Sequence, residues 1–230
     1  MKYLRFFILL SVFIYSGCFK AFAQGVITEG KVVYEISFPD MELDQKYQAM
    51  MPSESIVYFK DKKSRTEMTV SAGIHTASIL DSKSGEIITL TDMMGTKNAM
   101  ILTEKDQLKS KEKTKDKVKD QFPVITYQNE TKVIAGYTCK KVLIQTDAES
   151  KPIEIYYTDK LKSVMQINSG WKNFEGFPLE YTLDMEGMKM MMSAKSVTEE
   201  KVDDVQFEIP ADYKILTVAE MEKMMKGYDK

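Results

Sequence analysis

The sequence predicts a mainly β protein (α+β class) built on an antiparallel sheet, and three observations lead to this fold class. Short runs rich in β-branched and aromatic residues recur along the chain, polar turn residues separate many of them, and only two segments have a helical pattern. Beyond the N-terminal segment there is no internal repeat and no linker. We therefore expect a single domain over residues 24–230.

Residues 1–23 have the pattern of an export signal. Two basic residues precede a short apolar run, and Ala21-Phe22-Ala23 forms a small-x-small cleavage site. This pattern predicts a protein of the periplasm or the extracellular space. Cys18 leaves a second route open, because Ser16-Gly17-Cys18 resembles the end of a lipoprotein cleavage box, and a lipidated Cys18 would then become the new N-terminus.

Strand signals dominate the rest of the chain. From Val26 to Phe38 the even positions are mostly apolar and the odd positions include charged residues, as in a strand with one buried face. Because turn residues separate the runs that follow, we expect a long antiparallel meander. The further strands are expected at Ser55–Lys60, Arg65–Val70, Ile74–Leu80, Glu86–Thr91, Ala99–Thr103, Val124–Tyr127, Tyr137–Thr146, Ile153–Thr158, Leu179–Met185, Met188–Thr198 and Val205–Ile209.

Glu186-Gly187 gives the clearest turn, since a two-residue loop fixes the register of a hairpin. On one side of the sheet, Asp184 then lies across from Lys189, which is a favourable charge pair. The pairs on the other side are apolar: Met185 with Met188, Leu183 with Met190, Tyr181 with Met192, and Leu179 with Ala194.

Two segments have helical signals. Thr217-Val218-Ala219-Glu220 has the form of a capping box, and the apolar stripe that follows must dock on an apolar surface, because about ten residues are too few for an isolated helix. This helix, Thr217–Lys226, is our candidate lid, with the residues Val218, Met221, Met224 and Met225. The lysine-rich segment from Glu104 to Asp120 is either a solvated helix or loop, or a peripheral membrane contact through Lys105–Lys119.

Composition excludes several classes of function. Acidic residues outnumber basic ones by 34 to 32, which argues against nucleic acid as a partner. Outside the signal, Cys139 is the single cysteine and His75 the single histidine, so the sequence predicts no internal disulfide and no histidine-based catalytic or metal site. With no catalytic motif either, we expect a protein that is not an enzyme and needs no cofactor.

Methionine is the compositional outlier, with 17 residues. Thioethers fill irregular cores, and they also line surfaces that accept variable apolar ligands. Three interpretations stay open: core filler, a groove for acyl chains or a lipidated partner, and a Cu(I) site, since soft thioethers select that ion. The candidate groove consists of Leu179, Tyr181, Leu183, Met185, Met188, Met190 and Met192.

Arg65 is the single arginine outside the signal. A guanidinium can hold a planar partner in a way that lysine cannot, so this arginine either has a specific acceptor or forms a surface pair with Glu67 on its own strand face.

Several segments together resemble a family of exported bacterial proteins of unknown function that is similar to the lipoprotein-localisation factors LolA and LolB. The resemblance rests on an opening Gly30-Lys31-Val32-Val33-Tyr34-Glu35, on Ile134–Lys141, on Gly176-Phe177-Pro178-Leu179-Glu180 and on a closing Phe207–Tyr213. It implies a strongly curved antiparallel sheet, a half-barrel, whose apolar concave face is covered by short helices and accepts acyl chains. It also implies a candidate latch for the lid at Arg65.

These observations predict a non-enzymatic cell-envelope protein that binds a lipid, an acyl chain or a lipidated partner in a Met-lined groove. The alternatives are a structural or interaction module whose groove is filled by its own side chains, and a Cu(I)-binding protein. The sequence leaves the oligomeric state open.

Overall fold

The computed structural model describes residues 25–41, 44, 47, 50–70, 73–107, 109, 123–145, 151–163, 174–185, 188–218 and 220. The export signal predicted at residues 1–23 lies outside this part. The strands are β1 (Glu29–Ser37), β2 (Glu54–Lys60), β3 (Lys63–Val70), β4 (Ile74–Asp81), β5 (Glu86–Met93), β6 (Thr96–Leu102), β7 (Val124–Ile134), β8 (Tyr137–Gln145), β9 (Ile153–Thr158), β10 (Phe177–Met185), β11 (Met188–Glu199) and β12 (Lys214–Leu216).

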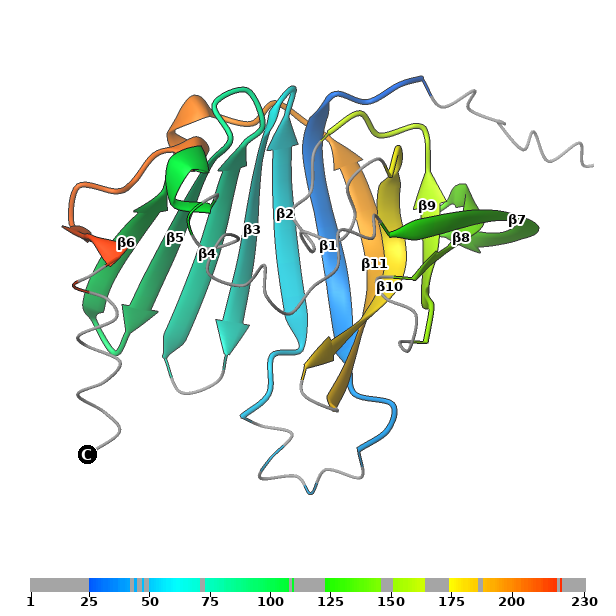
Figure 1. Cartoon of the computed structure of the whole chain (residues 1–230), viewed down its shortest axis with the longest axis horizontal. Coiled ribbons are helices and arrows are strands. Elements are labelled where there is room, and N and C mark those ends of the chain that lie inside the picture. Colours follow the sequence, from blue (N-terminus) through cyan, green and yellow to red (C-terminus); the bar gives the residue numbers. More distant parts are fainter. Residues whose placement is uncertain are drawn as a thin grey trace, which may run out of the picture.

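All of these strands belong to one 12-stranded sheet with the order β12-β6-β5-β4-β3-β2-β1-β11-β10-β9-β8-β7 (Figure 1). The single meander expected from the sequence is wrong in one respect. The chain runs from β1 to β6, passes to the opposite edge, and runs back from β7 to β11, so that β11 pairs with β1. That pairing sets Met192 of β11 opposite Ile36 and Ala194 opposite Tyr34, which buries apolar residues on one face.

The β10–β11 hairpin has the register that the sequence predicts. Met185 pairs with Met188, Leu183 with Met190, and Tyr181 with Met192, while Asp184 lies opposite Lys189 on the other face. The pairing begins at Glu180 with Ser193, so the expected pair of Leu179 with Ala194 lies beyond it. Local sequence alone therefore predicted the register of β10 with β11.

The strand expected at Val205–Ile209 is wrong, because Asp204–Phe207 forms a 3₁₀ helix, η2. The Asp203 side chain accepts a hydrogen bond from the Val205 backbone N–H and caps the helix. Within one helical turn, Val205 is 60% exposed whereas Phe207 is 5% exposed. Strand alternation would have placed both side chains on one face, and helical geometry separates them.

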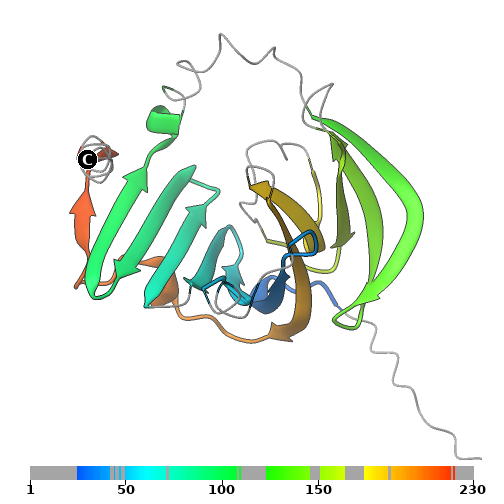
Figure 2. The same ribbon diagram turned by 90° about the horizontal axis from the view of Figure 1, so that it is seen from below.

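Figure 2 shows that the sheet curves strongly and leaves one side open. Register assigns every residue of β1–β6 to one of its two faces. The concave face contains Tyr34 and the residues that share its side of the sheet. The convex face contains all the charged residues of these six strands. The crossover from β11 to β12, residues 200–213, runs along the convex side (Figure 2). This crossover covers the apolar convex residues Ala77, Ile79, Leu90 and Ala99 with Val202 and Phe207.

A second and larger core fills the concave side where β1 and β2 meet β8–β11. The rings of Tyr34 and Tyr181 meet edge to face with their centroids 6.0 Å apart, and the ring centroids of Phe59 and Phe177 are 5.5 Å apart. Tyr34 also donates its hydroxyl proton to the Pro178 carbonyl at 2.7 Å. Curvature brings these strands close enough for their concave residues to pack against one another, so this half of the concave face is closed by its own side chains.

Three cations of the convex face hold the crossover. Arg65 donates Nε–H to Glu67 Oε1 at 2.6 Å and Nη1–H to the Gln206 carbonyl at 3.1 Å. Lys60 donates to the Val202 carbonyl and pairs with Asp204. Farther along, Lys97 pairs with Asp212 and lies over the Tyr213 ring, and the hydrogen bond to Asp212 raises the pKa of Lys97.

Arg65→Met should loosen this crossover. The Arg65 side chain is 13% exposed, and its loss removes two hydrogen bonds from a charged donor, so we expect the free energy of unfolding to fall by about 1–3 kcal/mol. Lys140→Met removes an ion pair whose two side chains are each 56% exposed, and it should cost under about 1 kcal/mol. Urea denaturation measures both variants. Equal midpoints for the two would show that the Arg65 contacts contribute nothing beyond a surface pair.

Candidate functional site

The open half of the concave face lies on β3–β6, where three rows of residues cross the four strands. The central row is Thr66, Ser78, Thr89 and Met100, each opposite the next. On one side of it lies the row Met68, Thr76, Thr91 and Asn98, and on the other the row Ser64, Leu80, Ile87 and Leu102. Apart from the buried Ser64 and Ile87, all of these residues are half-buried. This surface is our candidate site and is called the open concave face below.

Most polar side chains of the open concave face have no partner among the residues that the structure describes. Within the part of the chain that the structure describes, Thr66, Ser78, Thr89, Thr91 and Asn98 form no side-chain hydrogen bond, whereas Thr76 donates to the Met68 carbonyl at 3.4 Å. Ser64 is only 2% exposed and likewise forms none among the described residues. Because hydroxyl groups in such positions normally find a partner, these groups are available to water or to a bound molecule.

The electrostatic character of this face is uniform. No position of β1–β6 on the concave side carries a charged residue, since all of them lie on the convex side. The one phenol there is that of Tyr34, whose pKa is raised chiefly by burial and further by Tyr181 and Cys139. The open concave face therefore offers apolar surface and neutral hydrogen-bonding groups, and no fixed charge.

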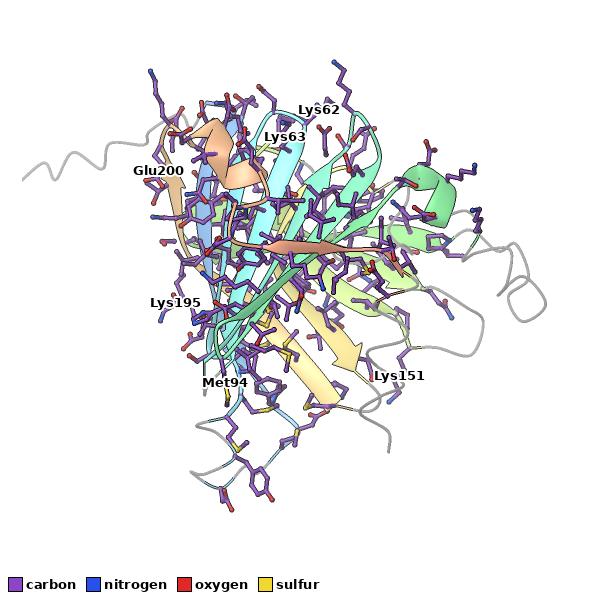
Figure 3. All side chains as sticks on the ribbon, turned by 90° about the vertical axis from the view of Figure 1, so that its left-hand side faces the viewer. Lys62, Lys63, Met94, Lys151, Lys195 and Glu200 are labelled. Carbon is purple, nitrogen blue, oxygen red and sulfur yellow. The ribbon has the colours of Figure 1, made fainter. Side chains whose placement is uncertain are left out.

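The two ends of the sheet differ in composition. At one end the β2–β3 turn carries Lys62 and Lys63, and at the other the β5–β6 turn carries Met94 (Figure 3). Met93 and Met94 are 51% and 81% exposed. The loop between β1 and β2 lies at the same end as the β5–β6 turn (Figure 1), and its Met41 and Met50 are exposed as well. Exposed apolar side chains thus gather at one rim of the sheet.

The structure separates the candidate groove residues into two groups. Leu179, Tyr181, Met190 and Met192 are at most 5% exposed and belong to the large core. Leu183 and Met188 are half-buried near the hairpin end of the same face, and the side chain of Met185 lies outside the described residues. The predicted face does point to the concave side, but its deeper part is occupied by neighbouring strands.

The candidate lid is described only at its start. Thr217 and Glu220 form a reciprocal capping box, in which Thr217 N–H donates to Glu220 Oε2 at 2.8 Å and Glu220 N–H donates to Thr217 Oγ1 at 3.2 Å. Val218 is half-buried. Met221, Met224 and Met225 lie outside the described residues, as does most of Lys105–Lys119, of which 105–107 and 109 are described and helical.

The candidate latch, Arg65, lies on the convex face, opposite the concave face that carries the methionines of the candidate groove. Its acceptors are Glu67, as the sequence suggested, and the Gln206 carbonyl of the crossover. The crossover that Arg65 contacts leads through β12 to the start of the candidate lid.

Cys139 is fully buried within the large core, and this burial raises the pKa of its thiol to about 11. The thiolate is the reactive form of cysteine, so we expect native protein at pH 8 to react with a thiol reagent at least about a hundred times more slowly than urea-unfolded protein. Absorbance with a disulfide reagent measures both rates. Comparable rates would show that Cys139 is accessible. Cys139→Ala should leave ligand binding unchanged.

The described residues lack two features. They contain no cluster of three or more His, Cys, Asp or Glu residues that could hold a metal ion. They also contain no helix that is long and apolar enough to cross a membrane.

Sequence analysis missed the open concave face. The signal for it in the sequence was alternation. In β3 and β5 the charged residues fall only on alternate positions of the strand, and the positions between these include Thr66, Met68, Thr89 and Thr91. Threonine is common in strands on either face, so this alternation alone did not distinguish a binding surface from ordinary strand composition.

Comparison with known proteins adds evidence on fold. A model described as a domain of unknown function (DUF4412) matches residues 158–213, from the end of β9 through β10 and β11 to the crossover. No curated protein matches the chain. Two crystal forms of PNGF-II are similar to it, each at 16% identity over 86% of this chain, with TM-scores of 0.52 and 0.51.

This chain spans only about one third of the PNGF-II chain, 33% and 32% in the two forms. A β-barrel-like protein of unknown function (DUF1849) from Brucella abortus matches 78% of this chain over its whole length, at 7% identity and a TM-score of 0.33. At such identities the likeness to PNGF-II concerns fold alone. The fold class that results is mainly β, with one large, curved, open and antiparallel-dominated sheet.

Proposed function

We propose that this is an exported, non-enzymatic protein of the cell envelope that binds a lipid, an acyl chain or a lipidated partner on its open concave face. The observation that carries the proposal is the separation of charge: all charged residues of β1–β6 lie on the convex face, and the concave residues of β3–β6 are uncharged and mostly half-buried. The likeness to LolA and LolB suggested by sequence motifs belongs to the same proposal.

Burial of apolar area would drive such binding. Each methylene group removed from water contributes about 0.8 kcal/mol, so an acyl chain lying along the row of Leu80, Ile87 and Leu102 could be held without a specific polar contact. Half-buried apolar residues on this face lose their remaining contact with water when a chain covers them. The exposed methionines of the β5–β6 turn lie at the rim where such a chain would approach.

One observation favours a second candidate, an interaction module with a filled groove. Tyr181, Met190 and Met192 are buried among the module's own side chains, as that reading expects. The two candidates differ over β3–β6, because a filled module needs no ligand on the open concave face.

Native mass spectrometry of the protein purified from its own cell envelope tests the proposal. We expect wild-type protein to carry a noncovalent adduct with the mass of a lipid. Met100→Asp, on the open concave face, should lose this adduct. Ile101→Asp, at the next position of β6 and half-buried on the convex face, should retain it.

Three results would contradict the proposal. Absence of any adduct on wild-type protein would favour the filled module, and a copper adduct would favour the Cu(I) alternative. Equal retention by both variants would place the lipid elsewhere. The intact mass also reports the N-terminus, for which we expect cleavage after Ala23, or a lipidated Cys18 by the second route.

A further inference from the structure

We propose that the part of the ligand held against β3–β6 contains a neutral hydrogen-bonding linkage, an ester or an amide, next to its acyl chain and carries no ionised group there. This inference rests on the proposed function and names the ligand class for the same surface. Three features of the open concave face lead to it.

The first feature is the absence of charge. An ionised carboxylate or phosphate that moved onto this face would lose hydration, and no position of β1–β6 on the concave side carries a cation to compensate. Lys60, Lys97 and Arg65 all lie on the convex side, where carboxylates and carbonyl groups of the protein already occupy them. A free fatty acid would therefore bind poorly through its head group.

The second feature is the set of unpartnered polar groups. Thr66, Ser78 and Thr89 lie side by side on three adjacent strands and form no side-chain hydrogen bond among the described residues. Adjacent strands are about 4.8 Å apart, so this row presents hydroxyl groups over about 10 Å. A hydroxyl can donate to an ester or amide carbonyl and can accept from an amide N–H. A plain hydrocarbon would leave all of these groups without a partner, which costs free energy.

The third feature is the arrangement of polar and apolar residues in adjacent rows. The row beside Thr66, Ser78 and Thr89 contains Leu80, Ile87 and Leu102, together with Ser64, whose buried hydroxyl has no partner among the described residues. Met100 ends the central row, and Met68 begins the row on the other side. A linkage placed on the hydroxyl row would thus have apolar side chains for its acyl chain on the side of Leu80, Ile87 and Leu102, whereas the row that begins with Met68 continues with Thr76, Thr91 and Asn98.

Competition binding tests the inference on the full exported protein. The probe is the uncharged dye N-phenyl-1-naphthylamine, and the two competitors are monoolein and sodium oleate at pH 9, both below the concentrations at which they aggregate. They share one acyl chain and differ in having a neutral ester or an ionised carboxylate. We expect monoolein to displace the dye with an affinity at least about ten times higher than that of oleate, since a desolvated anion without a partner costs more than 1.4 kcal/mol.

Three variants separate hydrogen bonding from apolar contact. Thr89→Val keeps the shape of the side chain, and it should lower the affinity for monoolein about 2–10-fold relative to the affinity for the dye. Thr89→Ser retains the hydroxyl and should restore monoolein binding. Thr69→Val, on the convex face of β3, is the matched control and should leave the affinities for monoolein and for the dye unchanged. Melting temperatures confirm that all three variants are folded.

The outcomes are distinguishable. Oleate binding as tightly as monoolein, or Thr89→Val binding monoolein like wild type, would overturn this inference while the dye result still supports a lipid-binding face. Failure of the wild-type protein to bind the dye and both lipids would overturn the proposed function together with the inference.

Discussion

Met190→Asp is expected to unfold the protein. Met190 is 5% exposed on the concave side of β11, pairs with Leu183 across the hairpin, and belongs to the large core with Tyr34 and Tyr181. Aspartate at this position removes apolar contacts and buries a polar group without a partner, so we expect a loss of about 4 kcal/mol or more. This is a large part of the stability of an ordinary domain.

Met191→Asp is the matched control, since Met191 is the next residue of β11 and is half-buried on the convex face. It should lower the free energy of unfolding by about 1 kcal/mol or less. Circular dichroism melts and urea titrations of the two variants measure the difference. A folded Met190→Asp variant with the melting temperature of Met191→Asp would mean that Met190 faces open space, and the groove predicted from the methionine stripe would then extend into β11.

Gly30→Ala should have the second largest effect. A Cβ atom at Gly30 would lie 2.3 Å from the Thr198 carbonyl oxygen and 3.3 Å from the Phe59 ring. The carbonyl belongs to the backbone of β11, which pairs with β1, so it cannot move without disturbing the junction of the two meanders. We expect a loss of about 3 kcal/mol or more in the free energy of unfolding.

Gly25→Ala is the control, because nothing lies within 4 Å of a Cβ added there. It should change stability by no more than about 0.5 kcal/mol. Denaturant titration gives both values. If Gly30→Ala is as stable as Gly25→Ala, then the spacing of β1 and β11 differs from the structure described above.

Local sequence pattern was sufficient to predict most of the strands and the register of β10 with β11. Alternation and turn residues are properties of a few neighbouring residues, and the strands that they predict, such as Ile153–Thr158, form as expected. The order of the strands in the sheet could not be predicted from local pattern. Nothing near β6 or β7 encodes that the chain passes to the far edge of the sheet, because the pairing of β11 with β1 depends on residues more than 150 positions apart.

The candidate site shows the same division. Alternation correctly placed Met190 and Met192 on one face, but it did not show that this face is buried in the large core together with residues of β1, β2 and β8–β10. Conversely, Thr66 and Thr89 carried no distinct signal, and only the register across β3–β5 shows that they lie side by side. Curvature and long-range pairing therefore decide which part of the concave side is closed and which part is open.

Photo-crosslinking tests the central claim most directly. Purified wild-type protein is loaded with a monoacylglycerol that bears a diazirine on its acyl chain, irradiated, and digested for peptide mass spectrometry. The account predicts crosslinks on the open concave face, at Met68, Leu80, Met100 and Leu102. Crosslinks confined to the convex crossover around Phe207 and Ile209, or protein that remains unlabelled at saturating probe, would contradict it.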